Sequence, residues 1–119
     1  MSLDIYGTMP VQTHQCPNCG HCEIGTYETI FEHNITHNLR DMARESGCGI
    51  LWDMDYDTKA GALIAPLTEA IQNLQNHPEK FNVFSASNGW GTREQFIPWL
   101  QKLLVDCIAF PHATLNISK

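Results

Sequence analysis

Alternating apolar and polar positions near both ends of the chain predict short, half-buried strands. Residues 3–7 and residues 113–118 alternate in this way, whereas residues 26–32 are rich in β-branched and aromatic side chains. We therefore expect strands in these three segments. Between the first two, Gly7, Pro10 and the Cys-Pro-Asn-Cys-Gly run at 16–20 predict a turn-rich connection, and residues 83–92 fit either a loop or a short strand.

Three segments carry apolar residues at the spacing of a helix. The first begins near Asn34 or Thr36 and ends at Ser46, with Gly47 as its C-terminal stop. The second runs over residues 59–76, and its apolar stripe consists of Leu63, Leu67, Ala70, Ile71 and Leu74.

The third helix opens where Thr92 and Gln95 have the spacing of a capping box, and Pro111 ends it. Its expected inner face consists of Phe96, Trp99, Leu100, Leu103, Leu104 and Cys107. A chain of 119 residues has the size of one domain. The pattern therefore predicts a single α+β domain over residues 1–119, with three helices packed on a short sheet.

The distribution of charge narrows the choice of partners. The formal net charge is −6, and all seven basic residues lie at position 40 or beyond. Such an acidic N-terminal third repels phosphate backbones, so nucleic acid is a poor partner. No apolar run reaches membrane-spanning length and no secretory signal is visible, so we expect a cytoplasmic protein that does not contact membranes.

Clustered cysteines predict a structural zinc site in a knuckle segment over residues 14–37. Cys16 and Cys19 have the spacing that brings two thiolates to one ion, and His33 and His37 follow one residue off the spacing of a two-Cys, two-His finger. If residues 33–37 are helical, both imidazoles share one face. The two cysteines rank first as ligands, then His37, then His33.

Other ligand sets and another role for the ion stay open. Cys22 or His14 can replace His33, because a helix that begins after Asn34 leaves His33 outside it. An open metal position beside Glu23 or Glu32 would instead predict a zinc-dependent hydrolase or transferase. Four protein ligands would instead close the site, and a small domain uses such a closed zinc site to stabilise its fold. We favour this structural role over a catalytic one.

Two polar segments are candidates for ligand binding. Asn34, Thr36 and Asn38 alternate at a helix start, where they can cap backbone amides or bind a polar ligand. Asn88 and Trp90 stand beside glycines that let the backbone approach another group closely. No hydrolase, phosphate-loop or dinucleotide-binding motif is present, so we expect a binding protein rather than an enzyme.

Several segments together resemble a set of small uncharacterised proteins of bacteria and their phages. These segments are Leu-Asp-Ile-Tyr at 3–6, the Cys-Pro-Asn-Cys-Gly run, Asn-Ile-Thr-His-Asn-Leu at 34–39, Asn-Gly-Trp-Gly-Thr at 88–92 and Ala-Thr-Leu-Asn-Ile-Ser at 113–118. The resemblance implies a bacterial or phage cytoplasmic setting and a shared pattern containing Cys16, Cys19 and His37 more than His33. It implies no established activity.

The sequence therefore predicts a non-enzymatic, zinc-stabilised binding module that engages a protein or a small polar ligand. The resemblance adds the expectation that it is phage- or prophage-encoded. A nucleic-acid-binding zinc finger ranks last among the alternatives. A homodimer built on the last helix is left open.

Overall fold

The computed structural model describes residues 2–15, 22–54, 58–84 and 91–118, with the main chain alone for residues 11–15 and 22–27. Within these ranges the α-helices are α1 (Arg40–Ser46), α2 (Ile50–Asp53), α3 (Ile64–Asn76), α4 (Pro78–Asn82) and α5 (Arg93–Ala109). The strands are β1 (Ser2–Gln15), β2 (Cys22–Thr36) and β3 (Thr114–Ser118). The 3₁₀ turns η1 (His37–Leu39) and η2 (Ala60–Leu63) precede α1 and α3.

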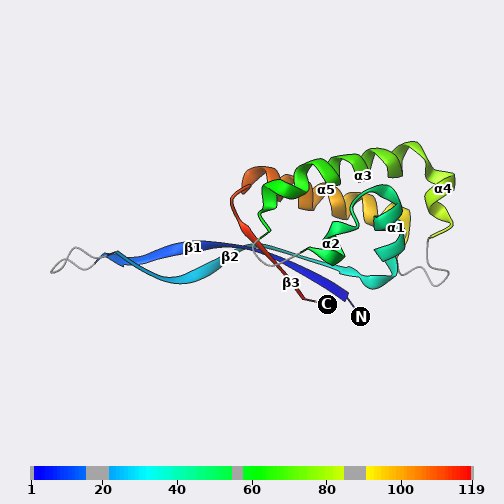
Figure 1. The fold of residues 1–119 in the computed structure, drawn as a ribbon. Coiled ribbons are helices and arrows are strands. Elements are labelled where there is room, and N and C mark those ends of the chain that lie inside the picture. The colour runs from blue at the N-terminus through cyan, green and yellow to red at the C-terminus, as the bar shows by residue number, and fades with distance from the viewer. Residues whose placement is uncertain (1, 16–21, 55–57, 85–90, 119) are drawn as a thin grey trace.

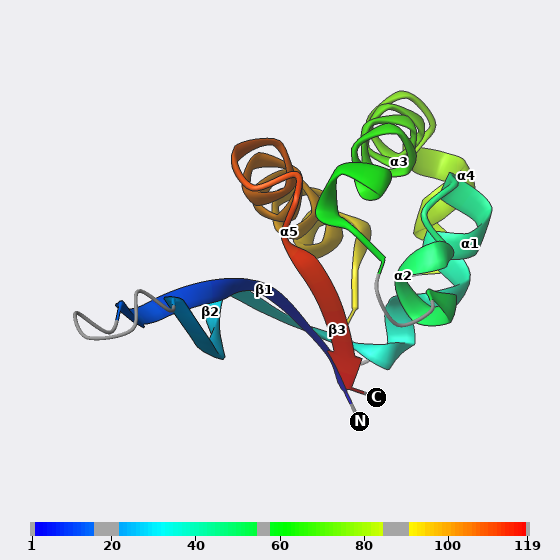
Figure 2. The same cartoon turned by 60° about the vertical axis from the view of Figure 1, so that its left-hand side comes forward.

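The strands form one antiparallel sheet in the order β2-β1-β3. β3 pairs with β1 only between Asp4 and Thr8, so the rest of the β1–β2 hairpin is a two-stranded ribbon. Figures 1 and 2 show the helices gathered at one end of the sheet, while the ribbon extends away from them. The molecule is accordingly long, with extents of 64 × 26 × 21 Å.

The α+β class is confirmed, but the strands are much longer than predicted. β1 continues through Gly7 and Pro10, where a turn-rich connection was expected. The ring of Phe31, opposite Gly7 in the ladder, lies 2.2 Å from where a Cβ of Gly7 would be, so the glycine makes room for the aromatic side chain. Pro10 lies beyond the residues of β1 that pair with β3, so one edge of β1 is free there and a proline is tolerated.

The three predicted helices are present, and two short ones accompany them. α2 forms inside the segment expected to be a connection, and α4 follows directly after the end of α3. The first predicted helix does not begin at Asn34, which lies in β2, but after Thr36. Gly47 ends it with φ of 117°, a left-handed conformation that favours glycine.

The core lies between the sheet and the helices. The apolar stripe predicted for residues 59–76 is buried at Leu63 in η2 and at Leu67, Ala70, Ile71 and Leu74 in α3. On α5 the buried residues are Phe96, Leu100, Leu103 and Cys107, whereas Trp99 and Leu104 are only partly buried. The same helix leaves Val105 and Ile108 exposed at 64% and 57%. Within the described ranges, no helix has the length and apolar character needed to cross a membrane.

Candidate functional site

Gly91, the residue that follows the second polar segment proposed for ligand binding, lies against the first polar segment. A Cβ at this position would lie 3.0 Å from Cβ of Asn38 and 3.2 Å from Cγ2 of Thr36. Gly91 also has φ of +104°, which disfavours any other residue. The chain therefore needs glycine here for two reasons, and that glycine brings the start of α5 against the end of β2.

A pocket of about 370 Å³ lies beside this contact. Its lining residues are Asn34, Ile35, Thr36, Leu39, Gly91, Gln95 and Trp99. It is open to the surface, and we call it the Trp99 pocket. Two of the predicted ligand-binding residues, Asn34 and Thr36, line it, and its volume falls within the range usual for small-molecule sites.

Trp99 is held in place on three sides. Its Nε1 donates to the backbone oxygen of Asn34 at 2.9 Å. Its ring stacks on Phe96 at an interplanar angle of 24°, and the ring of His33 meets it edge-on. These contacts fix the indole before any ligand arrives, which lowers the entropic cost of binding.

Asn34 is oriented by a contact across the hairpin. Its Nδ2 donates to the carboxylate of Asp4, the residue opposite it in the β1–β2 ladder. The Asp4–Asn34 pair alternates in the ladder with Ile35 and His33, so these two polar side chains lie on the face of the sheet opposite to the one that packs on α5.

Gln95 is oriented by the capping box that the sequence predicted. Its Oε1 accepts from the backbone N–H groups of Gly91 at 3.1 Å and Thr92 at 3.2 Å, and the hydroxyl of Thr92 accepts from the N–H of Gln95. Because the oxygen is occupied, Nε2 is the end that can serve a ligand as a donor.

Thr36 caps the turn that follows β2 and also lines the pocket. Its Oγ1 accepts from the backbone N–H of Asn38 at 3.3 Å and so caps η1. Because Oγ1 accepts in this bond, the hydroxyl hydrogen is still able to donate to another group. Capping and ligand contact are therefore compatible at this residue.

The remaining predicted ligand residues have a different status. Asn38 is exposed and packs beside Gly91, but it does not line the pocket. Asn88 and Trp90 lie outside the described residues. The sequence prediction did not include Gln95 or Trp99, which were assigned only to a cap and to the inner face of a helix. The hydrogen bond of Trp99 to Asn34 joins residues that are 65 positions apart, and a local sequence pattern does not predict such a contact.

The predicted metal ligands separate into two groups along the hairpin. Cys16 and Cys19 lie outside the described residues, in the connection between Gln15 and Cys22, which pair with each other. His33 follows roughly eleven residues further along β2, a distance of roughly 36 Å in a strand. Three extended residues between Cys19 and Cys22 reach only about 10 Å. This separation argues against one ion shared by Cys19 and His33.

The two histidines also do not share a helical face, because His33 lies in β2 and His37 in η1. His33 Nε2 forms a 2.6 Å hydrogen bond with the carboxylate of Asp106 on α5. His37 Nδ1 accepts from Nε1 of Trp52 at 3.1 Å, so the proton of the neutral ring is on Nε2. That Nε2 is buried with no hydrogen-bond partner among the described residues. His14 and Cys22, the alternative ligands, flank the connection that holds Cys16 and Cys19.

Cys48 and Cys107 are buried and do not behave as reactive thiols. Burial raises the pKa of Cys48 to about 12, against the opposing effect of a hydrogen bond with Ser46. Burial, together with the charge of Asp106, also raises the pKa of Cys107 to about 12. Both side chains therefore stay protonated near neutral pH, which makes them poor nucleophiles.

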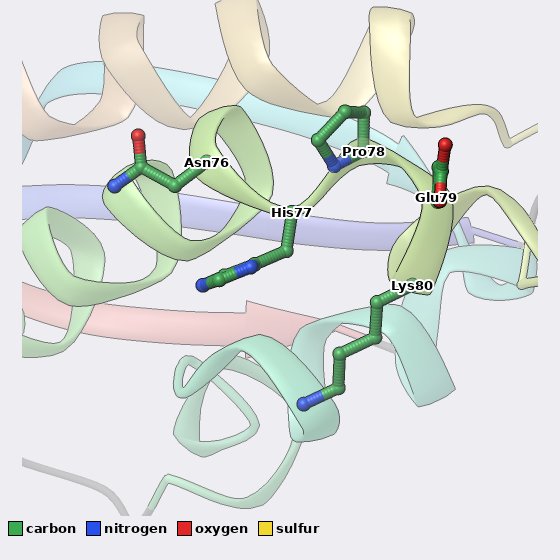
Figure 3. Close-up of a pocket in the computed structure, with 5 residues that line it drawn as sticks. All are labelled: Asn76, His77, Pro78, Glu79 and Lys80. Carbon is green, nitrogen blue, oxygen red and sulfur yellow. The ribbon is translucent and has the colours of Figure 1, made fainter.

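Two further features of the described chain do not add a site. No group of three or more His, Cys, Asp or Glu side chains is placed to hold a metal ion within the ranges the structure describes. A shallow pocket of about 380 Å³ is lined by the consecutive residues Asn76, His77, Pro78, Glu79 and Lys80 at the corner between α3 and α4. Figure 3 shows His77 and Lys80 on one side of this corner and Pro78 and Glu79 on the other, so their side chains do not converge.

Comparison with known proteins gives no relative from which a role could be carried over, because no family model, no curated protein and no solved structure matches the chain.

Proposed function

We propose that the chain is a non-enzymatic binding module that takes a small polar ligand in the Trp99 pocket. The observation that carries this proposal is the contact of Gly91 with Thr36 and Asn38, beside a surface pocket lined by Asn34, Thr36, Gln95 and Trp99. An indole with neutral hydrogen-bonding groups around it is typical of a site that binds without reacting.

The chemistry of the lining supports binding rather than catalysis. Its polar side chains are two carboxamides and one hydroxyl, none of which acts as a general acid or base near neutral pH. The His33–Asp106 pair lies next to Trp99 through the ring contact, but neither residue lines the pocket.

Structural zinc is part of the proposal, at the far end of the hairpin. A two-stranded ribbon without a third strand is marginally stable in water, and β1 and β2 extend well beyond the residues that β3 covers. A zinc ion held by Cys16 and Cys19, with Cys22 and His14 as the remaining ligands, would clamp the ribbon where Gln15 pairs with Cys22. The ion would stabilise the two-stranded ribbon and would not contact a ligand in the Trp99 pocket.

A thermal-shift screen with a library of small polar metabolites tests the binding function. We expect some compounds to raise the Tm of the wild-type protein, because a ligand that binds only the folded state stabilises it. The same compounds should lose this effect in Thr36→Val, which removes the hydroxyl but keeps a β-branched side chain.

The matched control is Thr68→Val. Thr68 is exposed on α3, and its hydroxyl donates to the backbone oxygen of Ile64, away from the pocket. Compounds should stabilise this variant as they stabilise the wild type. A library without any stabilising compound, or compounds that act equally on Thr36→Val, would overturn the proposal.

A further inference from the structure

The edges of the sheet differ in how they are protected against pairing with another strand. On β3, the backbone N–H of Leu115 donates to the oxygen of Thr58 at 2.8 Å, and Lys59 forms a bridge with Thr114, so the chain before η2 covers this edge. β1 has a free edge beyond the residues that pair with β3. Pro10 lies there and has no backbone N–H, so this edge is a poor template for a further strand.

β2 is an edge strand, and Trp99 identifies the backbone groups of β2 that point away from β1. The indole Nε1 donates to the backbone oxygen of Asn34 at 2.9 Å. The side chains of Asp4 and Asn34 also touch across the ladder, as they do in a pair whose backbone groups point outward. Because this direction repeats at every second residue, the N–H and C=O of Glu32 point outward as well.

The outward groups of Glu32 and the N–H of Asn34 are open to a partner. No hydrogen bond outside the ladder joins them to another residue in the described ranges. The side chain of Glu32 is exposed, and the sequence of β2 contains no proline. The register of the ladder shifts between Phe31 and Thr29, and the indole of Trp99 occupies the oxygen of Asn34. The open edge is therefore a short stretch over residues 31–34.

We propose that this edge binds an extended segment of a partner protein, which pairs with β2 and places a Lys or Arg beside Glu32. Main-chain hydrogen bonds to a free edge are a common mode of peptide recognition. The charge fits a basic segment, because Glu28 and Glu32 are exposed on β2 and residues 1–39 contain no Lys or Arg. A second copy of β2 would instead bring two acidic strands side by side, which is unfavourable.

This interaction goes beyond the proposed small-ligand site. It uses the main chain of β2 at Glu32 and Asn34, whereas the proposed ligand depends on the hydroxyl of Thr36. Thr36→Val should therefore leave the pairing with a peptide unchanged, so the two claims can fail separately.

Selection from a displayed library of random peptides on the full chain supplies the probe. The selected peptide is then synthesised with N-methyl groups on every second residue, in either of the two alternating sets. A strand that pairs with β2 uses the N–H groups of one set, so isothermal titration should show binding weakened about tenfold or more for that set. Methylation of the other set should change binding little. A library without a binding peptide, or an equal effect of both sets, would overturn the proposal.

Glu32→Pro is the matched protein variant. It removes an N–H that points away from β1, and proline is accepted at such a position of an edge strand, so the Tm should be nearly unchanged. Peptide binding should weaken about tenfold or more. Glu32→Gln is the control, because it keeps the N–H and removes the charge, and it should weaken binding only about threefold. Equal binding by Glu32→Pro and the wild type would contradict the proposal. If Glu32→Pro fails to fold, the two methylated peptides decide the question.

Amide hydrogen exchange locates the contact. The peptide should slow the exchange of the Glu32 and Asn34 amides about tenfold or more, because both become hydrogen-bonded. A selected peptide that protects neither amide binds elsewhere, and the proposal falls. Protection that rises with protein concentration in the absence of peptide would assign the edge to a second copy of the chain and would likewise overturn it.

Discussion

Gly91 lies so close to Thr36 that a Cβ at position 91 would be 3.2 Å from the threonine Cγ2. The backbone of Gly91 also has φ of +104°, so the position excludes a side chain on conformational grounds as well as steric ones. This contact joins β2 to the start of α5 and so builds one wall of the Trp99 pocket.

Gly91→Ala should therefore lower the free energy of unfolding by about 1–3 kcal/mol, the usual cost of a strained backbone with a close contact. It should also weaken any ligand of the Trp99 pocket. Urea denaturation and a repeat of the thermal-shift screen measure the two effects.

Gly47→Ala provides the comparison. Gly47 also has a positive φ, of +117°, but the neighbour of an added Cβ is the flexible carboxylate end of Glu69, and the site is remote from the pocket lining. This variant should lose stability without changing ligand response. If Gly91→Ala were as stable as the wild type, the contact described here would be incorrect.

The hydrogen bond between His33 and Asp106 fastens β2 to α5. Asp106→Asn keeps the shape of the side chain but removes the charge, so we expect a loss of about 1 kcal/mol in unfolding free energy, reduced by the partial exposure of the pair. Urea denaturation measures this loss of unfolding free energy. The control is Glu45→Gln, a substitution of an exposed residue on α1. Equal stability of Asp106→Asn and the wild type would show that the pair contributes nothing to the fold.

The buried thiols predict a loss of stability at alkaline pH. The pKa values of Cys48 and Cys107 are raised from 9.0 to about 12 in the folded protein, mainly by burial. Between these values the folded state holds protons that the unfolded state has released, so the free energy of unfolding falls as the pH rises from 9 towards 12. Below pH 9 these groups add no pH dependence.

Cys107→Ala should make this alkaline fall less steep, because one of the titrating groups is gone. Denaturation midpoints measured at intervals across the same pH range test the slope. An identical slope for Cys107→Ala and the wild type would contradict the assignment of a protonated, buried thiol.

The expected zinc content follows from the geometry of the hairpin. Native mass spectrometry of protein purified without chelator should show one zinc per chain, in line with the sequence prediction of a single structural site. Cys16→Ser and Cys22→Ser should lose the ion, whereas His33→Gln should keep it, because His33 lies far along β2 from Cys22, the residue at which the strand begins. Loss of zinc in His33→Gln but not in Cys22→Ser would contradict this ligand set, and a protein without zinc would contradict the site itself.

The sequence predicted those parts of the fold that depend on neighbours along the chain. The capping box of Thr92 and Gln95 and the stop at Gly47 are local signals, and both are confirmed. The apolar stripe of α3 follows from helical spacing alone. Each of these needs only residues within a few positions of one another.

The length of the hairpin could not be predicted in this way. Gly7 and Pro10 indicate turns when taken locally, and only the ring of Phe31 on the neighbouring strand explains why a glycine belongs in β1. For the same reason the local pattern selected Asn34 and Thr36 as ligand residues but not Trp99, whose bond to the backbone of Asn34 joins distant parts of the chain.

The most direct test of the account is the location of binding. The indole N–H signal of Trp99, assigned from its absence in Trp99→Phe, can be followed by ¹H–¹⁵N NMR during titration with the compound that raises the Tm most. We predict that this signal shifts with saturation, while that of Trp52, which is fully buried and bonded to His37, stays in place. A stabilising compound that leaves the Trp99 signal unchanged would contradict the claim that the pocket between β2 and α5 is the binding site.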